Sequence, residues 1–203
     1  MGAIRTSDGR LVDPFNPKPE DIIPKVFIHS ISQINRYTGH VKHPYSVGQH
    51  TRNLVYTVPK HLRRAALVHD WAEAWFNDVA SPVKAECEDY KQAEHAAMVF
   101  IAEHMGVSKG ELSELDPWDK SIYINERDAG FDYIRNLGMG DDRKGIPDMG
   151  PWYFAETYWQ DIRFDLANEF NWLFPTRAPI DFTPTMRQVL VPAGTKQVTL
   201  NVR

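Results

Sequence analysis

Two histidines and two aspartates are the residues of this sequence whose types could together hold a metal ion. They are His50, the adjacent pair His69 and Asp70, and Asp128. Imidazole nitrogens combined with carboxylate oxygens suit a divalent cation of intermediate hardness, and a set of this size leaves positions open for water and substrate. Spacing alone is a weak indication, because a histidine on an apolar helix face is more often a core residue than a ligand.

The sequence predicts helices at both histidines. Residues 46–49 read Ser-Val-Gly-Gln, which has the spacing of a capping box, so a helix that contains His50 is expected to begin there. Residues 61–76 are rich in Ala and Leu, which are good helix formers. This second helix is expected to hold His69 and Asp70 on a rigid rod.

A third helix is expected to carry Asp128. The pair Asp116 and Pro117 has the form of an N-cap followed by a first-turn proline, and the helix is expected to run from there to Gly138. The remaining pattern predicts helices over 24–36, 86–105 and 151–174, a loop over 138–150, a hairpin around Asp8 and Gly9, and a terminal strand at Val198, Leu200 and Val202. The expected fold is mainly α, with one helical domain over 1–175, a short N-terminal β-hairpin, and an extended C-terminal tail over 176–203.

Composition narrows the class of protein. The chain of 203 residues is long enough for one domain with a buried core. A formal net charge of −4 and a pI near 6.1 argue against polymeric nucleic acid as a ligand. The sequence has no apolar run that could span a bilayer, and its single cysteine, Cys87, cannot form an internal disulfide. We therefore expect a cytoplasmic protein without a membrane partner.

Several segments resemble one known family. Residues 66–74 read ALVHDWAEA and residues 77–84 read NDVASPVK, while residues 36–40, 45–51 and 125–129 read RYTGH, YSVGQHT and NERDA. Together with an opening Arg-Thr-x-x-Gly-Arg hairpin, these segments resemble HD-domain phosphohydrolases. The match is to the branch of bacterial 5′-deoxynucleotidases and phage deoxynucleoside-triphosphate triphosphohydrolases, some of which deplete dATP. The likeness extends from about residue 4 to about residue 137, and the chain after residue 174 has no counterpart.

This resemblance implies an HD-domain helical bundle with one bound divalent ion. In that family the residues that match His50, His69, Asp70 and Asp128 bind the metal, which would be Mn, Co, Zn, Fe or Mg. If a phage encodes the chain, the expected location is the host cytoplasm. A homo-oligomer is also expected, because family members commonly self-associate.

Two further carboxylates are expected to act in catalysis. Glu73 follows His69 by four residues and Asp70 by three, so a helix would place it on their side, as a general base or a water-positioning residue. Asp78 matches an aspartate that lies beside the scissile phosphate or the sugar in related nucleotidases. Its expected role is proton donor or substrate gate, and the alternative is that it caps a turn.

Four residues are candidates for substrate binding. Arg36 and Lys84 flank the metal-binding segments, and arginine can grip a phosphate with two hydrogen bonds while lysine acts as a point charge. Lys84 is equally compatible with a solvated surface. His43, on the loop that leads to His50, could donate a hydrogen bond to phosphate. Trp71 either stacks on a base or belongs to the core.

The implied reaction is hydrolysis of the bond between the 5′-oxygen of a deoxynucleoside and its α-phosphorus. A monophosphate substrate would yield phosphate, and a triphosphate substrate would release triphosphate whole. Two alternatives remain: an HD-type phosphodiesterase that acts on another phosphoester, and a regulatory module that binds metal and nucleotide without turnover.

Overall fold

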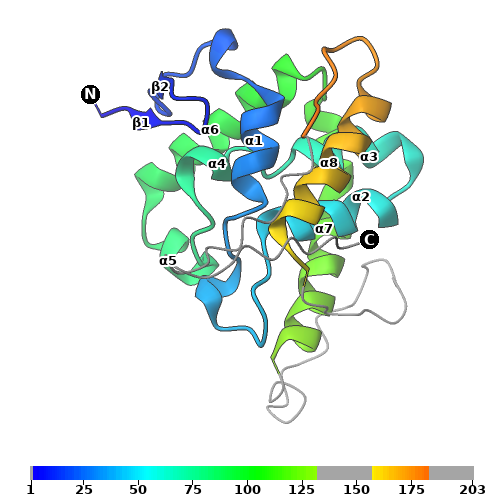
Figure 1. The fold of residues 1–203 in the computed structure, drawn as a ribbon. Coiled ribbons are helices and arrows are strands. Elements are labelled where there is room, and N and C mark those ends of the chain that lie inside the picture. The colour runs from blue at the N-terminus through cyan, green and yellow to red at the C-terminus, as the bar shows by residue number, and fades with distance from the viewer. Residues whose placement is uncertain (1, 132–156, 183–203) are drawn as a thin grey trace, which may run out of the picture.

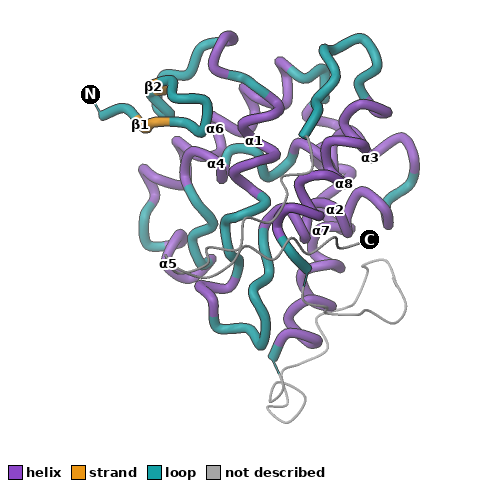
Figure 2. Tube along the Cα trace, in the orientation of Figure 1, coloured by secondary structure: helices purple, strands orange, loops and turns teal. Residues whose placement is uncertain are grey.

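The computed structural model describes residues 2–131 and 157–182, which form a mainly helical fold with two short strands near the N-terminus (Figures 1 and 2). The expected mainly α fold with an N-terminal hairpin is confirmed. The strands and helices are β1 (Ile4–Arg5), β2 (Leu11–Val12), α1 (Pro24–Ile31), α2 (Val47–Thr57), α3 (Arg63–Val68), α4 (Glu73–Phe76), α5 (Ser81–Ala85), α6 (Glu88–His104), α7 (Lys109–Gly130) and α8 (Trp159–Leu173).

The hairpin forms as its turn residues predict. Strands β1 and β2 pair antiparallel, with Ile4 opposite Val12. Gly9 lies in the turn with a φ of 88°, a left-handed conformation that costs glycine little. Val12 is buried in the core, so this short hairpin is anchored by its second strand.

Helices α1 and α2 meet at a close backbone contact. Helix α1 ends at Ile31, with Ser32 as its C-cap residue, about a turn earlier than the sequence predicts. A Cβ placed on Gly48, in the first turn of α2, would lie 2.8 Å from the Cα of Ser32. Only a residue without a side chain fits there, so Gly48 sets how closely α2 approaches the end of α1.

The core lies between α1, α2, α3 and α8, which pack on one another. Trp71 is fully buried in it, and its ring stacks on Phe27 with centroids 5.1 Å apart and planes 8° apart. On another side Trp71 stacks on Phe170 of α8 at 6.3 Å. Trp71 is therefore a core residue, and the alternative that it stacks on a nucleobase is wrong.

Residues 61–76 do not form one continuous helix. Helix α3 ends at Val68, and α4 begins at Glu73. Between them the amide of Trp71 donates to the carbonyl of Val68 at 3.1 Å, and the amide of Glu73 donates to the carbonyl of Asp70 at 3.1 Å. These three-residue hydrogen bonds tighten the chain into a turn. The expected rigid rod is thus wrong, and the pair His69 and Asp70 lies at a turn between two short helices.

Helix α7 begins earlier than the sequence suggests. Its start is a capping box in which the Ser108 side chain accepts from the amide of Glu111 at 3.2 Å, while the Glu111 carboxylate accepts from the amide of Ser108 at 2.8 Å. Pro117 therefore lies inside the helix and does not start it. The preceding helix α6 ends at His104, and Gly106 follows with a φ of 71°, as expected of a helix stop.

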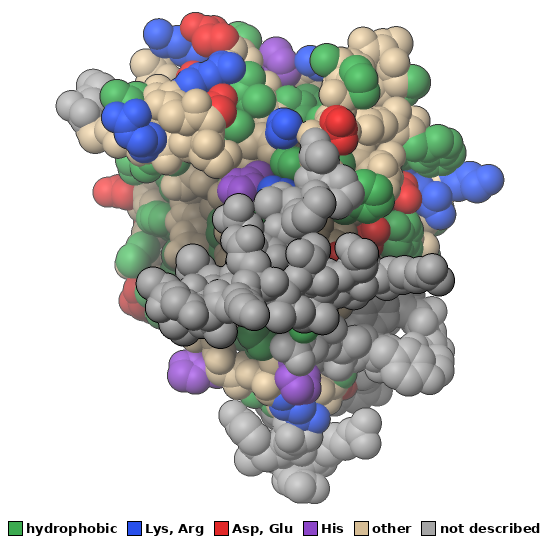
Figure 3. All heavy atoms as spheres, in the orientation of Figure 1, with side chains coloured by type: hydrophobic (Ala, Val, Ile, Leu, Met, Phe, Trp, Pro, Cys, Tyr) green, Lys and Arg blue, Asp and Glu red, His purple; other side chains and the backbone are tan. Residues whose placement is uncertain are grey.

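Helix α7 ends at Gly130, and Phe131 after it has an extended backbone, so the expected continuation of this helix to Gly138 is wrong. Other expectations fall on residues that the structure does not describe: the loop over 138–150, the first part of the helix over 151–174, and the terminal strand after residue 197. Within residues 2–131 and 157–182, none of the helices combines the length and the apolar character that crossing a bilayer requires. Where Figure 3 colours the surface, basic, acidic and apolar side chains are interspersed, which matches the near-neutral net charge.

Candidate metal centre

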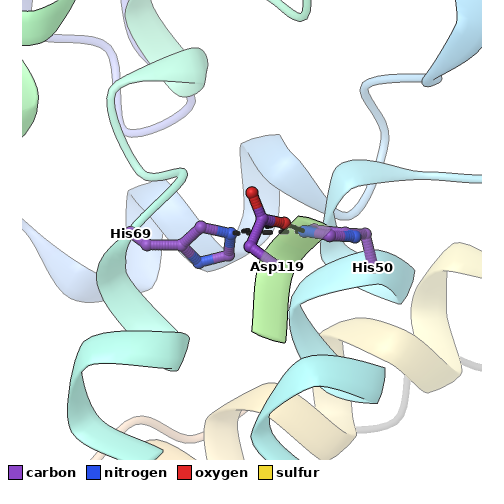
Figure 4. Close-up of side chains that lie close together, drawn as sticks. All are labelled: His50, His69 and Asp119. Atoms are coloured by element: carbon purple, nitrogen blue, oxygen red, sulfur yellow. Dashed lines mark hydrogen bonds and ion pairs between the residues drawn. The ribbon is translucent and has the colours of Figure 1, made fainter. Parts of the chain in front are cut away.

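Two helices and one turn, separated in the sequence, bring His50, His69 and Asp119 together (Figure 4). His50 lies in the first turn of α2, whose start is capped by Ser46, because the Ser46 hydroxyl accepts from the amide of Gln49 at 3.0 Å. His69 lies in the turn after α3, and Asp119 lies on α7. The two imidazoles point toward each other, with the Asp119 carboxylate between them.

The ligand atoms of these residues have the separations that one cation requires. His50 Nε2 lies 3.2 Å from His69 Nε2 and 3.0 Å from Asp119 Oδ1, and His69 Nε2 lies 4.0 Å from Asp119 Oδ1. Atoms that bind one ion at about 2.1 Å lie about 3 to 4 Å from one another. The His50 side chain is fully buried and that of Asp119 is 42% exposed, so the group is open on the aspartate side.

Asp70 lies beside the same two histidines. Its Oδ2 is 3.1 Å from His69 Nε2 and 3.6 Å from His50 Nε2. Burial raises the pKa of Asp70, but the neighbouring charges of His69, His50 and Arg36 outweigh it and hold this pKa far below the ordinary range. Asp70 is therefore a carboxylate, and it offers a fourth ligand atom.

Asp119, and not Asp128, is the aspartate of α7 that lies beside the two histidines, whereas the family resemblance implied Asp128 as the ligand. Both residues lie on α7, nine residues apart, which corresponds to about 900° and so to opposite faces of the helix. The Asp128 side chain is 31% exposed, and its Oδ1 accepts from Arg127 at 3.0 Å. The structure thus brings together His50, His69 and Asp70 and replaces Asp128 with Asp119.

Glu126 is a second residue of α7 that sequence reasoning missed. It is fully buried, and its Oε1 lies 2.8 Å from His50 Nδ1 and accepts from the Tyr45 hydroxyl at 2.7 Å. Its Oε2 accepts from the Tyr37 hydroxyl at 2.8 Å and lies 3.6 Å from Arg36 Nε. Asp119 and Glu126 are seven residues apart, which places both on one face of α7, and this spacing is the sequence signal that could have identified them.

The charges around His50 show that the group attracts a cation. Burial and the Arg36 charge lower the pKa of His50, but the charge of Glu126 and the hydrogen bonds that His50 donates to Asp119 and Glu126 outweigh them and raise it to about 10. For Asp119, burial raises the pKa, and the hydrogen bond and charge of His50 lower it by more. In the metal-free protein a proton on His50 balances these carboxylates, and a metal ion would displace it.

Glu73 and Asp78 are carboxylates with the opposite behaviour. Burial, together with the charges of Asp70 and Asp78, raises the pKa of Glu73 well above its ordinary value, and within the described residues its buried Oε2 has no hydrogen-bond partner. Burial also raises the pKa of Asp78, which interacts electrostatically with Arg36 and Lys84. Both side chains therefore lie in the electrostatic environment of Asp70, and each is a stronger proton acceptor than a free carboxylate.

The candidates for substrate binding differ in how they are held. Arg36 directs Nη1 at Asp70 Oδ2, 3.4 Å away, so its guanidinium lies next to the ligand group. Lys84 forms an ion pair with Glu94 at 2.7 Å. His43 is exposed in the loop before α2, and within the described residues no hydrogen bond or ion pair joins it to the histidines of the centre. Of these residues, only Arg36 contacts the ligand group directly.

The donor set fits a divalent cation. Two imidazole nitrogens and two carboxylate oxygens converge, and the carboxylates repel each other: Asp70 raises the pKa of Asp119. A cation between them would relieve this repulsion. The group of His50, His69 and Asp119 is therefore able to bind a metal ion.

Comparison with curated proteins identifies a relative of this chain. No protein-family model matches the chain. The chain is 32% identical over 152 residues to the uncharacterized protein YfdR of Escherichia coli (strain K12), and the matching region covers 72% of this chain and 82% of that protein. The chain therefore belongs to the family of the YfdR protein.

Proposed function

We propose that this protein is a divalent-metal-dependent phosphohydrolase that cleaves the 5′-phosphoester of deoxynucleotides. The observation that carries the proposal is the convergence of His50, His69 and Asp119 from three separate segments of the chain, with Asp70 beside them. A partly open group of this composition is typical of catalytic metal sites, because structural sites are closed by their protein ligands. The resemblance of the segments around His50 and His69 to HD-domain phosphohydrolases supplies the reaction class.

Arg36 is the residue best placed to bind a phosphoryl group. Its Nε lies near Glu126 and its Nη1 near Asp70, so the planar guanidinium is held in one orientation at the edge of the ligand group. A fixed guanidinium can donate two parallel hydrogen bonds to phosphate oxygens. Lys84 would have to leave Glu94 to reach a phosphate, so we assign it a secondary role.

Glu73 and Asp78 provide the proton transfers. A carboxylate with a raised pKa is a stronger proton acceptor, which suits Glu73 to take a proton from the attacking water. The raised pKa of Asp78 favours its protonated form, which can donate a proton to the leaving 5′-oxygen. A bound divalent ion, held by His50, His69, Asp70 and Asp119, would polarise the phosphoryl oxygen and favour ionisation of water near neutral pH.

The proposal includes five candidate metals and two candidate lengths of the substrate's phosphate chain. Imidazole and carboxylate ligands together are compatible with Mn, Co, Zn, Fe or Mg. A deoxynucleoside monophosphate would yield phosphate, and a deoxynucleoside triphosphate such as dATP would yield triphosphate.

The test is product analysis with a nucleotide panel. Purified protein is incubated with Mn²⁺, Co²⁺ or Mg²⁺ and with ribonucleotides and deoxynucleotides, and the products are separated by anion exchange. We expect a deoxynucleoside together with either phosphate or triphosphate. Glu73→Gln is expected to keep the metal and to lose about 10²- to 10⁴-fold in turnover, the usual contribution of a general base.

Two outcomes would overturn the proposal. Nucleotide binding without turnover for any substrate and metal would assign the protein to the regulatory alternative. Full activity of Asp70→Ala would show that hydrolysis occurs elsewhere, since this variant lacks a carboxylate 3.1 Å from His69 Nε2.

A further inference from the structure

Four groups converge on one buried carboxylate behind the metal centre. Glu126 has a fully buried side chain, yet it bonds with His50, Tyr37 and Tyr45 and lies 3.6 Å from Arg36 Nε. Burying a carboxylate is costly, and an apolar side chain at this place would avoid the cost. The number and direction of its contacts therefore indicate a role beyond packing.

The contact with His50 determines which nitrogen of that imidazole can bind a metal. An ionised carboxylate only accepts hydrogen bonds, so Glu126 Oε1, 2.8 Å from His50 Nδ1, requires a proton on Nδ1. In the neutral imidazole the lone pair then resides on Nε2. That nitrogen is the one that faces His69 Nε2 at 3.2 Å and Asp119 Oδ1 at 3.0 Å.

The second oxygen of Glu126 holds the loop that presents Arg36. Tyr37 and Thr38 have φ angles of 59° and 53°, and two successive non-glycine residues in the left-handed region need support from their surroundings. The Tyr37 hydroxyl donates to Glu126 Oε2, and the Tyr37 ring packs edge-on against Phe131. One carboxylate thus connects a metal ligand with the loop of the phosphate-binding arginine.

We propose that Glu126 is a positioning residue that fixes the orientation and tautomer of His50 for metal binding and holds the Arg36 loop beside it. This inference rests on the metal centre of the proposed function. It adds a residue that itself contacts neither metal nor substrate.

The test measures metal affinity without any nucleotide. Zn²⁺ or Mn²⁺ alone is titrated against a chromophoric chelator for wild type, Glu126→Gln and Tyr45→Phe, and thermal unfolding confirms that each variant is folded. A glutamine can turn its amide N–H toward Nδ1, which favours the wrong tautomer, so we expect the affinity of Glu126→Gln to fall about 10- to 100-fold. Tyr45→Phe is the matched control. It removes a donor from the same carboxylate but spares His50, so its affinity should stay within about threefold of wild type.

A spectroscopic signature separates positioning from mere stabilisation. In Zn²⁺-loaded wild type, nitrogen-15 NMR of the histidine side chains should show His50 protonated at Nδ1. Unchanged affinity in folded Glu126→Gln, an equal loss in Tyr45→Phe, or an Nδ1 without a proton would each refute the proposal. If Glu126→Gln does not fold, Glu126→Asp replaces it. Its carboxylate is withdrawn from Nδ1 by one methylene, and it must also lose affinity.

The two proposals can fail separately. Because the titration contains only metal, a loss of affinity in Glu126→Gln supports the positioning role even if no nucleotide is hydrolysed. Hydrolysis by a Glu126→Gln protein of normal metal affinity would refute the positioning role and leave the proposed function intact.

Discussion

Replacing Asp119 should abolish tight metal binding, and replacing Asp128 should not. Asp119 supplies one of three ligand atoms that lie within 4.8 Å of one another. Loss of a residue that only orients a ligand usually lowers metal affinity 10- to 100-fold, so loss of a ligand should lower it by at least about 100-fold, or about 2.7 kcal/mol. Asp128 is a matched control, because it is another partly exposed aspartate on the opposite face of the same helix.

Chelator competition with Zn²⁺ or Mn²⁺ compares Asp119→Ala and Asp128→Ala at pH 7, with circular dichroism to confirm that both fold. We expect Asp128→Ala to bind metal within about threefold of wild type. A large loss in Asp128→Ala, or wild-type affinity in Asp119→Ala, would refute the assignment of ligands from the geometry of α7.

Three further predictions concern the free energy of unfolding, measured by chemical denaturation. Glu73→Gln should stabilise the metal-free protein near pH 7. The pKa of Glu73 in the folded state is raised above its ordinary value of 4.5, so folding takes up a proton at any pH between these two pKa values. The stability of the wild type therefore falls as the pH rises above 4.5. This gain should shrink as the pH falls toward 4.5, and a gain independent of pH would contradict it. Trp71→Ala should cost about 3 to 5 kcal/mol, because it removes the ring that stacks on Phe27; a changed KM with unchanged stability would instead indicate a substrate contact. Gly48→Ala should cost about 1 to 3 kcal/mol, since the new methyl group would meet the backbone of Ser32 at 2.8 Å, and wild-type stability would refute this contact.

Local signals in the sequence were sufficient for some elements and misleading for others. The Asp8 and Gly9 turn and the Ser46 cap depend on neighbouring residues: the hairpin forms as predicted, and of the expected capping box the serine half forms, in which the Ser46 hydroxyl accepts from the amide of Gln49. The start of α7 was misplaced because Pro117 was interpreted as a helix start, whereas the capping box at Ser108 begins the helix. Asp119 lies in the first turn of the helix that the sequence predicts, but in the third turn of the helix that forms.

The sequence by itself determined the helical class of the fold and located the segments with His50 and His69, because periodicity, caps and turn residues act over a few positions. Only the tertiary structure decided which carboxylates reach them. Asp119 and Glu126 approach His50 because α7 packs against α2 with one particular face turned toward it, and packing of distant segments sets that rotation. In the same way, contacts with Phe27 of α1 and Phe170 of α8 bury Trp71 in the core.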